Sequence, residues 1–304
     1  MRERPNISSD KSNVVQLLVW FLFIVSVFGI CARMGTKYIT NRWTFRWDDK
    51  LILMAQIAFL AETISVSIGA SFGLGKAMST LSEETISNTL KAEYASTPLL
   101  ILTLTLVKWS LSSFIYRISL ERAHHRIAVG IMAIVGLWAV TSTATSFARC
   151  RAPAPWDYIH GQHCIDRRAW WTYISVLDAG TEICFIAQYI LVLRALRLSL
   201  LKRALLIFIF STRTLVVVVI VAQLVVFRGT YSLPDVTYNA WLPATLNQIC
   251  GSLSITTACI PYLKPFMKSL EADIMRVDST GDSGEGMVTR DYNPSHVTGY
   301  RMSG

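Results

Sequence analysis

Long apolar runs separated by short polar connections dominate this chain. A helix needs about 17 to 25 predominantly apolar residues to cross a bilayer, and seven segments meet that requirement. They are Val14–Ala32, Leu51–Phe72, Ala95–Tyr116, Ile127–Ala148, Ala169–Leu193, Ala204–Phe227 and Ala240–Leu263. No window alternates with the two-residue period of a membrane β-strand. The pattern therefore predicts an all-α, polytopic membrane protein built as one bundle of seven transmembrane helices.

The composition also favours a membrane protein. Of 304 residues, 52% are hydrophobic and 16% are charged, whereas about 25% of the residues in a soluble domain are charged. The formal net charge of +9 comes from cations in short connections between apolar runs, where they act as topology signals and lipid head-group contacts. We therefore expect the lipid bilayer as a partner and no nucleic acid.

The ends of the chain differ from its middle. Cations precede the first apolar segment, but its 19 residues exceed the about 7 to 15 of a signal-peptide core, and no small-x-small cleavage site follows. We expect a retained helix after a short extracellular N-terminus, residues 1–13. Residues 14–263 form the predicted membrane domain. Residues 264–304 form a cytosolic tail whose later part is rich in Gly, Ser, Thr and Asp, a composition typical of disorder.

Orientation follows from the cations in the connections. One set of alternating connections (33–50, 117–126, 194–203 and 264–276) holds 15 Lys and Arg residues, and the other set holds 10. The positive-inside rule then predicts an N-terminus outside and a C-terminus in the cytosol. We expect the plasma membrane, and the sequence carries no retention signal that separates it from an internal membrane.

The connection that contains Cys150 and Cys164 lies outside in this topology, where disulfides persist. A bridge between them closes a 15-residue loop, worth about 3 kcal/mol in the chain-entropy model. His160 and His163 offer an alternative as metal ligands beside Cys164, but their spacing is not a standard zinc pattern. We predict the disulfide and no metal. Asn6 begins a glycosylation sequon on the predicted outer side.

Thr80 to Glu83 reads T-L-S-E, the pattern of a capping box, and apolar residues follow it at helical spacing. It predicts a short helix that lies on the outer interface before the third apolar segment.

Five ionisable residues fall inside the predicted spans, and each costs about 2.5 to 3.5 kcal/mol on insertion scales. They are Glu62, Lys108, Asp178, Glu182 and Arg213. Asp178 and Glu182 are four residues apart and share one helix face. Two interpretations stay open: the charges pair and lock neighbouring helices, or they line a polar cavity that binds a ligand or passes protons. Tryptophans could line the same cavity, namely Trp109, Trp138, Trp170, Trp171 and Trp241.

Motifs of familiar enzymes are missing from the sequence. It contains no Gly-rich nucleotide-binding motif, no H-E-x-x-H and no G-x-S-x-G. A retinal pigment needs a Schiff-base lysine within the seventh helix, and Lys264 lies only at the end of that segment. We therefore assign no catalytic residue and no cofactor, and we expect a protein that is not an enzyme.

Short motifs in a characteristic order resemble the fungal rhodopsin-like integral membrane family. They extend from about Trp47 to Pro265: Asp48-Asp49, GLGKAM (Gly73 to Met78), Tyr94-Ala95-Ser96, Lys108, Cys150-Arg151, Trp156-Asp157, Cys164-Ile165-Asp166, Thr181-Glu182, the basic Leu198–Arg203 segment and ACIPYLKP (Ala258 to Pro265). The family comprises seven-helix proteins, including receptor-like surface sensors and members encoded in secondary-metabolite gene clusters.

The chain departs from the family pattern at several positions. Ala77 stands where members usually have His, Glu182 where they have Asp, and Gln188 where they have Pro. Gln223 and Gln248 stand where an arginine of the sixth helix and a glutamate of the seventh are common. We infer that these two glutamines replace an acid–base pair between those helices.

The resemblance implies a receptor-like membrane protein that binds a small, apolar molecule within the bundle. Arg194–Arg203 and the tail would contact a cytosolic partner. Two alternatives stay open: a membrane protein of a secondary-metabolite cluster, such as a mycotoxin cluster, that acts on or transports an intermediate, and a scaffold whose buried charges only lock helices.

Overall fold

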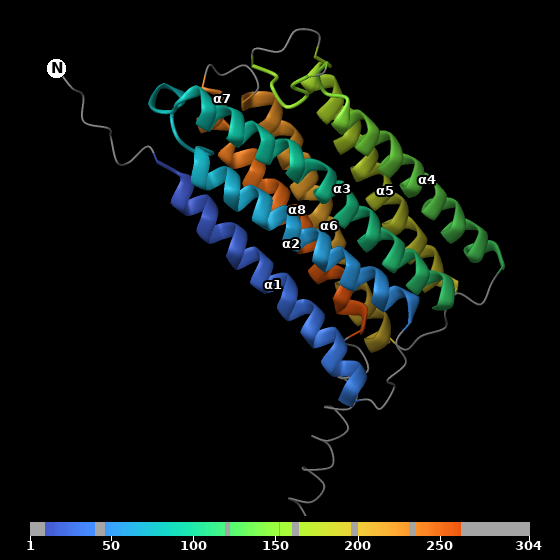
Figure 1. Ribbon diagram of the computed structural model, residues 1–304. Coiled ribbons are helices and arrows are strands. Elements are labelled where there is room, and N and C mark those ends of the chain that lie inside the picture. Colours follow the sequence, from blue (N-terminus) through green and yellow to red (C-terminus); the bar gives the residue numbers. More distant parts are fainter. Residues whose placement is uncertain are drawn as a thin grey trace, which may run out of the picture. The chain divides into compact units, whose positions relative to one another are not determined.

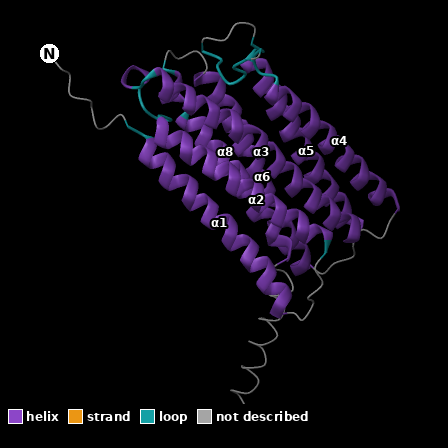
Figure 2. Cartoon of the chain, viewed as in Figure 1, coloured by secondary structure: helices purple, strands orange, loops and turns teal. Residues whose placement is uncertain are grey.

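The computed structural model describes residues 10–39, 46–118, 122–151, 153–159, 164–195, 200–230 and 235–262. Within these ranges the secondary structure is helical, with no strand (Figure 2). The long helices are α1 (Ser12–Ile39), α2 (Trp47–Phe72), α3 (Glu83–Ile118), α4 (Arg122–Phe147), α5 (Arg167–Ala195), α6 (Leu200–Thr230) and α8 (Trp241–Cys259). There are also three short elements in the described residues: η2 (Met78–Thr80) lies between α2 and α3, α7 (Val236–Asn239) lies between α6 and α8, and η3 (Ile260–Tyr262) follows α8.

Helices α1 to α6 each contain a stretch long and apolar enough to cross a membrane. The protein is therefore a multi-pass membrane protein, as the hydrophobic pattern predicts. Helix α8 forms where the seventh span is predicted, but it falls outside this group because its sequence is interrupted by Ser, Thr, Asn and Gln. Whether α8 crosses the membrane stays a prediction.

The position of α8 explains its polar composition. Consecutive helices from α1 to α6 pack against one another, and α8 closes the ring by contacting both α6 and α1. It also contacts α2 and α3 across the bundle, and α1 and α4 lie along opposite edges (Figure 1). Because α8 touches four helices, its polar side chains face protein rather than lipid.

The helices expose many apolar residues on the outside of the bundle and bury polar residues among the apolar ones of its interior, unlike a soluble bundle. In α1 the exposed side chains Leu17, Phe21, Ile24 and Phe28 recur every three or four residues and form one apolar stripe. Ser26 and Arg33 lie on the buried side of the same helix. Lipid solvates the outer stripe, so polar groups are stable only where other helices offer them partners.

One turn holds α7 and the beginning of α1 against the end of α2. Gly75 adopts a positive φ of 90°, a conformation that glycine tolerates best. Its carbonyl accepts the Lys11 N–H at 3.1 Å, and its own N–H donates to the Thr237 carbonyl at 3.0 Å. A Cβ at Gly75 would also approach the Lys11 backbone to 3.1 Å. The GLGKAM motif therefore joins three segments at one end of the bundle (Figure 1).

The predicted short interfacial helix is wrong. Helix α3 begins at Glu83 and runs without a break through Pro98 to Ile118. Thr80 ends η2 instead, and the Ser82 hydroxyl accepts the Thr85 N–H at 3.3 Å at the start of α3. No glycine or proline separates Glu83 from the third apolar segment, so the surface turns and the span form one helix.

Candidate functional site

Four of the five buried charges predicted in the spans meet in the interior of the bundle. The Lys108 ammonium of α3 forms an ion pair with the Asp178 carboxylate of α5. It also donates to the Thr181 hydroxyl at 2.6 Å and lies 3.7 Å from Glu182 Oε1. Arg213 of α6 reaches the other oxygen of Glu182 at 3.2 Å. The central cluster, Lys108, Asp178, Glu182 and Arg213, thus connects α3, α5 and α6.

Glu62 does not join these pairs. It is buried in α2, and no ion pair or hydrogen bond of its side chain occurs among the described residues, where its Oε2 is buried without a partner. Glu62 and three members of the central cluster, Lys108, Asp178 and Glu182, all act electrostatically on the Cys250 thiol of α8.

The central cluster is closely packed and leaves little room for a ligand. A cavity of about 20 Å³ touches Asp178 and is also lined by Thr97, Trp138, Trp171 and Gln223. This volume is enough for about one water molecule. The ion pairs between neighbouring helices are enough to explain why four of the five charges are buried. A functional role for these charges stays a prediction.

A larger pocket of about 330 Å³ lies at the end of the bundle that carries Cys150 and Cys164, here called the disulfide end. Its volume falls in the range of about 300 to 1,000 Å³ typical of small-molecule sites. Residues of α2, α3, α5, α6, α7, α8 and the segment between the two cysteines form its walls, and its apolar lining includes Val66, Leu74, Ile159, Trp171, Phe227 and Val236. Polar lining includes Ser65, Thr97, Glu93, Tyr158, Arg167, Asn239 and Asn247.

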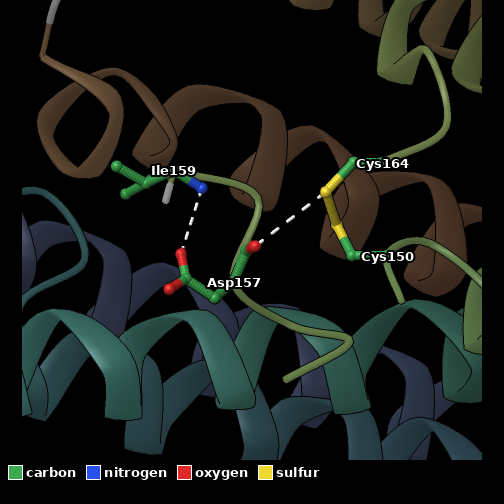
Figure 3. The surroundings of a disulfide bond; sticks show 4 residues. All are labelled: Cys150, Asp157, Ile159 and Cys164. Carbon is green, nitrogen blue, oxygen red and sulfur yellow. Dashed lines mark hydrogen bonds between the residues drawn. A yellow bond between two sulfur atoms is a disulfide. The ribbon is translucent and has the colours of Figure 1, made fainter. Parts of the chain in front are cut away.

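A disulfide holds one wall of this pocket, as the sequence predicts. The Cys150 and Cys164 sulfur atoms are 2.07 Å apart, and the Asp157 carbonyl approaches Cys164 while the Asp157 carboxylate accepts the Ile159 N–H at 3.1 Å (Figure 3). The Ile165 N–H donates to the Arg149 carbonyl at 2.8 Å. The bridge and these hydrogen bonds fix the segment that presents Tyr158 and Ile159 to the pocket.

Glu93 of α3 connects that segment to α5. Its Oε2 accepts the Tyr158 hydroxyl at 2.8 Å, and its Oε1 pairs with Arg167 Nη2 at 2.9 Å. The Arg167 guanidinium stacks 3.5 Å from the centre of the Tyr158 ring. Burial, and next the Glu93 charge, raises the pKa of Tyr158 above its ordinary value. The phenol is therefore protonated at neutral pH and acts as a donor.

Arg149, two residues after the end of α4, supports the same end of the bundle. Its guanidinium is buried and lies 4.5 Å from the centre of the Trp170 ring and 5.7 Å from that of Tyr94. Burial lowers the pKa of Arg149 to about 10, so the side chain is still cationic at neutral pH. This stacking joins the end of α4 to α3 and α5 just behind the disulfide.

The opposite end of the bundle contains a second charged cluster. Arg33 of α1 is fully buried and its Nη2 pairs with both Asp48 and Asp49 of α2 at 2.9 Å. Lys37, one turn further along α1, forms an ion pair with the second oxygen of Asp49. Hydropathy assigns Arg33 and Lys37 to a connection, whereas the structure places both in α1.

Tyr262 of η3 completes this cluster. Its hydroxyl donates to the Asp48 carboxylate, and its ring lies 3.6 Å from the Arg33 guanidinium. Arg117 Nη1, from the end of α3, pairs with Asp48 at 3.0 Å. The family motifs Asp48-Asp49 and ACIPYLKP thus meet in space, although they are more than 200 positions apart in the chain.

The inferred replacement of an acid–base pair by Gln223 and Gln248 stays a prediction, and the two glutamines now bind different partners. Gln223 of α6 donates to Asn247 of α8, and the Gln248 carbonyl oxygen accepts the Thr63 hydroxyl of α2 at 3.4 Å. Asn247 and Gln248 are adjacent and face different neighbours because successive residues of a helix point about 100° apart. A polar link between α6 and α8 exists, but through Asn247.

Several predictions fall outside the described residues. Asn6, His160 and His163 lie there, as do residues 264–304 and part of the Arg194–Arg203 segment. The sequence alone predicts little of the pocket of about 330 Å³. Trp171 is one of the tryptophans proposed above as cavity-lining residues, but Glu93, Tyr158 and Arg167 are not among the residues predicted for a site. They come together only through the fold.

Comparison with known proteins identifies a family. Residues 32–269 match the family model described as the fungal rhodopsin domain, and this match covers more than half of the chain. No curated protein matches the sequence.

Proposed function

Because the chain belongs to the fungal rhodopsin domain family, we propose that it is a receptor-like membrane protein that binds a small, apolar molecule in the pocket at the disulfide end. The observation that carries this proposal is the pocket of about 330 Å³, whose wall is held by the disulfide and by the Glu93–Arg167 ion pair. A concave, largely apolar space with a few converging polar groups is the usual form of a small-molecule site.

The proposal includes a topology. The pocket opens toward the outside of the cell, the N-terminus is extracellular, α8 is the seventh span, and the C-terminus is cytosolic at the plasma membrane. The disulfide supports this orientation because disulfides persist in oxidising compartments, and the excess of cations in the opposite connections supports it independently. The basic Arg194–Arg203 segment would then offer a cytosolic partner a positively charged surface.

Complementation of a deletion strain in the host fungus tests the proposal. The strain receives wild-type protein, the pocket-filling variant Ala244→Phe, or the control Ala133→Phe. Ala244 lines the pocket, whereas Ala133 is exposed on the outer face of α4. The readouts are the amount of protein at the cell surface, responses to surface and nutrient cues, and the profile of small molecules.

We expect the deletion strain to lose a response while its metabolite profile stays unchanged, and only Ala244→Phe to fail to restore that response. Restoration by Ala244→Phe at a normal surface amount would contradict ligand binding in this pocket. Accumulation of one defined intermediate in the deletion strain, with its responses intact, would contradict the receptor-like role and indicate a biosynthetic or transport role.

A further inference from the structure

The charges around the pocket are already balanced. Among the lining residues, the side chains charged at neutral pH are Glu93 and Arg167, which pair at 2.9 Å. Tyr158 occupies the second Glu93 oxygen at 2.8 Å. A charged ligand would either lie in the pocket without a counter-ion or break this pair, and both are unfavourable in a partly buried site. The pocket therefore favours a neutral ligand.

Two aromatic rings form part of the apolar wall. Trp171 of α5 and Phe227 of α6 lie with their ring centres 5.3 Å apart and their planes tilted by 45°. Aliphatic side chains, Val66 and Leu74 among them, line the pocket as well. Aromatic rings pack well against other flat apolar groups, so these walls suit a ligand with a flat apolar body.

The indole N–H of Trp171 finds no acceptor within the part of the chain that the structure describes. Trp171 is 7% exposed, and its Nε1 is buried without a hydrogen-bond partner among the described residues. The two other tryptophans that are buried in the described part of the chain do have one: Trp170 donates to the Thr145 hydroxyl at 2.9 Å and Trp138 to the Ile174 carbonyl at 3.3 Å. A buried donor without an acceptor is unusual in a folded protein and calls for a specific explanation.

The location of Trp171 offers that explanation. Its ring borders both the pocket of about 330 Å³ and the adjacent cavity of about 20 Å³. The smaller cavity also touches Asp178 of the central cluster. An oxygen atom that enters from the pocket could therefore accept the Trp171 N–H beside that cluster.

We propose that the ligand is a neutral molecule with a flat apolar body and a carbonyl oxygen, and that this oxygen accepts a hydrogen bond from Trp171 Nε1. The inference rests on the proposed function, because it assumes that the pocket binds a ligand. It adds the chemical class of that ligand and the residue that recognises its polar group.

Three probes of nearly the same shape test the inference with the full chain in lipid nanodiscs. 2-Acetylnaphthalene is neutral and carries a carbonyl, 2-isopropylnaphthalene is neutral without an acceptor, and 2-naphthoate is an anion. Saturable binding is measured by equilibrium dialysis, with nanodiscs of the pocket-filled Ala244→Phe protein as the blank for partition into lipid. The variant Trp171→Phe removes the donor and keeps a ring, and Trp170→Phe is the matched control because its N–H already has an acceptor.

We expect wild-type protein to bind 2-acetylnaphthalene about five- to tenfold more tightly than 2-isopropylnaphthalene, the effect of about one hydrogen bond. Trp171→Phe should abolish this preference and Trp170→Phe should retain it, while 2-naphthoate should bind more weakly than the ketone. NMR of indole-¹⁵N-labelled wild-type protein gives a second measurement that requires no folded variant. One indole N–H should shift downfield with the ketone and not with the hydrocarbon.

Three other results would each contradict one part of the inference. Binding of the ketone and the hydrocarbon with equal affinity, with no indole shift, would overturn the role of Trp171 and leave the pocket intact. Tighter binding of 2-naphthoate would overturn the neutral class. Binding of every probe at the level of the Ala244→Phe blank would overturn the proposed pocket itself, and this inference with it.

Discussion

The Lys108 ammonium and the Asp178 carboxylate form an ion pair that joins α3 to α5 in the interior of the bundle. Both side chains are almost fully buried. A buried ion pair contributes little net stability compared with apolar residues, but the loss of one partner leaves an uncompensated charge. This asymmetry makes the central cluster a sensitive point of the fold.

Replacing Lys108 by Met should destabilise the protein strongly. Asp178 and Glu182 would then share Arg213 as their remaining cation in the central cluster, and breaking a buried pair in this way costs about 3 to 5 kcal/mol. Thermal unfolding in nanodiscs measures the effect. The double variant Lys108→Met with Asp178→Asn should recover part of the loss because it removes both charges. A single variant as stable as wild type would show that the pair is not needed to hold α3 and α5.

Removing the disulfide should loosen the wall of the pocket. Cys150→Ser with Cys164→Ser abolishes the link between residues 14 apart, and the chain-entropy model assigns about 3 kcal/mol to a loop of this length.

Alkylation by a polymer-linked maleimide in denaturant should modify four cysteines of the wild-type chain before reduction and six after it. Cys31→Ser, a change at an exposed free cysteine, is the control. Six modified cysteines before reduction would contradict the disulfide.

At the opposite end, Arg33→Met should be far more harmful than Lys50→Met. Arg33 is fully buried between two carboxylates, so its loss should cost about 3 to 5 kcal/mol. Lys50 is exposed and lies 4.5 Å from the centre of the Trp47 ring, and a surface change of this kind usually stays within about 0.5 kcal/mol. Melting temperatures of the two purified variants provide the comparison. Equal losses would show that the Arg33 cluster does not hold the helix ends together.

Tyr158→Phe should make the protein less sensitive to alkaline pH. In the folded state burial raises the pKa of Tyr158 above the ordinary value, which is about 10. Above that pH the unfolded chain releases the phenolic proton while the folded protein keeps it, so this group lowers stability as pH rises. At pH 8 the variant should be less stable because it lacks the hydrogen bond to Glu93. Thermal unfolding at pH 8 and pH 10.5 should show that the deficit shrinks.

A deficit that stays constant between these two pH values would contradict the buried, protonated phenol.

Arg149 has the opposite effect on the pH dependence of stability. Burial lowers the pKa of Arg149 to about 10 in the folded protein, below its value in the unfolded chain. Between these two pKa values the unfolded chain binds more protons than the folded protein, so stability rises with pH. Both proteins retain Arg149, so this contribution is common to them except for the part of the Arg149 pKa that depends on the Tyr158 charge.

The sequence by itself determined the helices, the membrane and the disulfide of this protein. Apolar runs of the length of a bilayer can satisfy their backbone hydrogen bonds in lipid only as helices, so their number and approximate positions follow from hydropathy. The ends of the helices do not. Hydropathy ends the first span at Ala32, whereas α1 continues to Ile39, because the acids of α2 provide partners for Arg33 and Lys37 inside the bundle.

Only the tertiary structure decided which polar groups meet. Lys108 and Asp178 are 70 positions apart, and Arg167 and Glu93 are 74 apart. Helical periodicity predicts on which face of its helix a residue lies, but it does not predict which residue of another helix it contacts. Hydropathy treats Arg167 as a connection cation and Glu93 as a surface acid, yet both line the pocket. A pocket is bounded by side chains of several helices and one disulfide-held segment, so its position depends on how those elements pack and not on any one stretch of sequence.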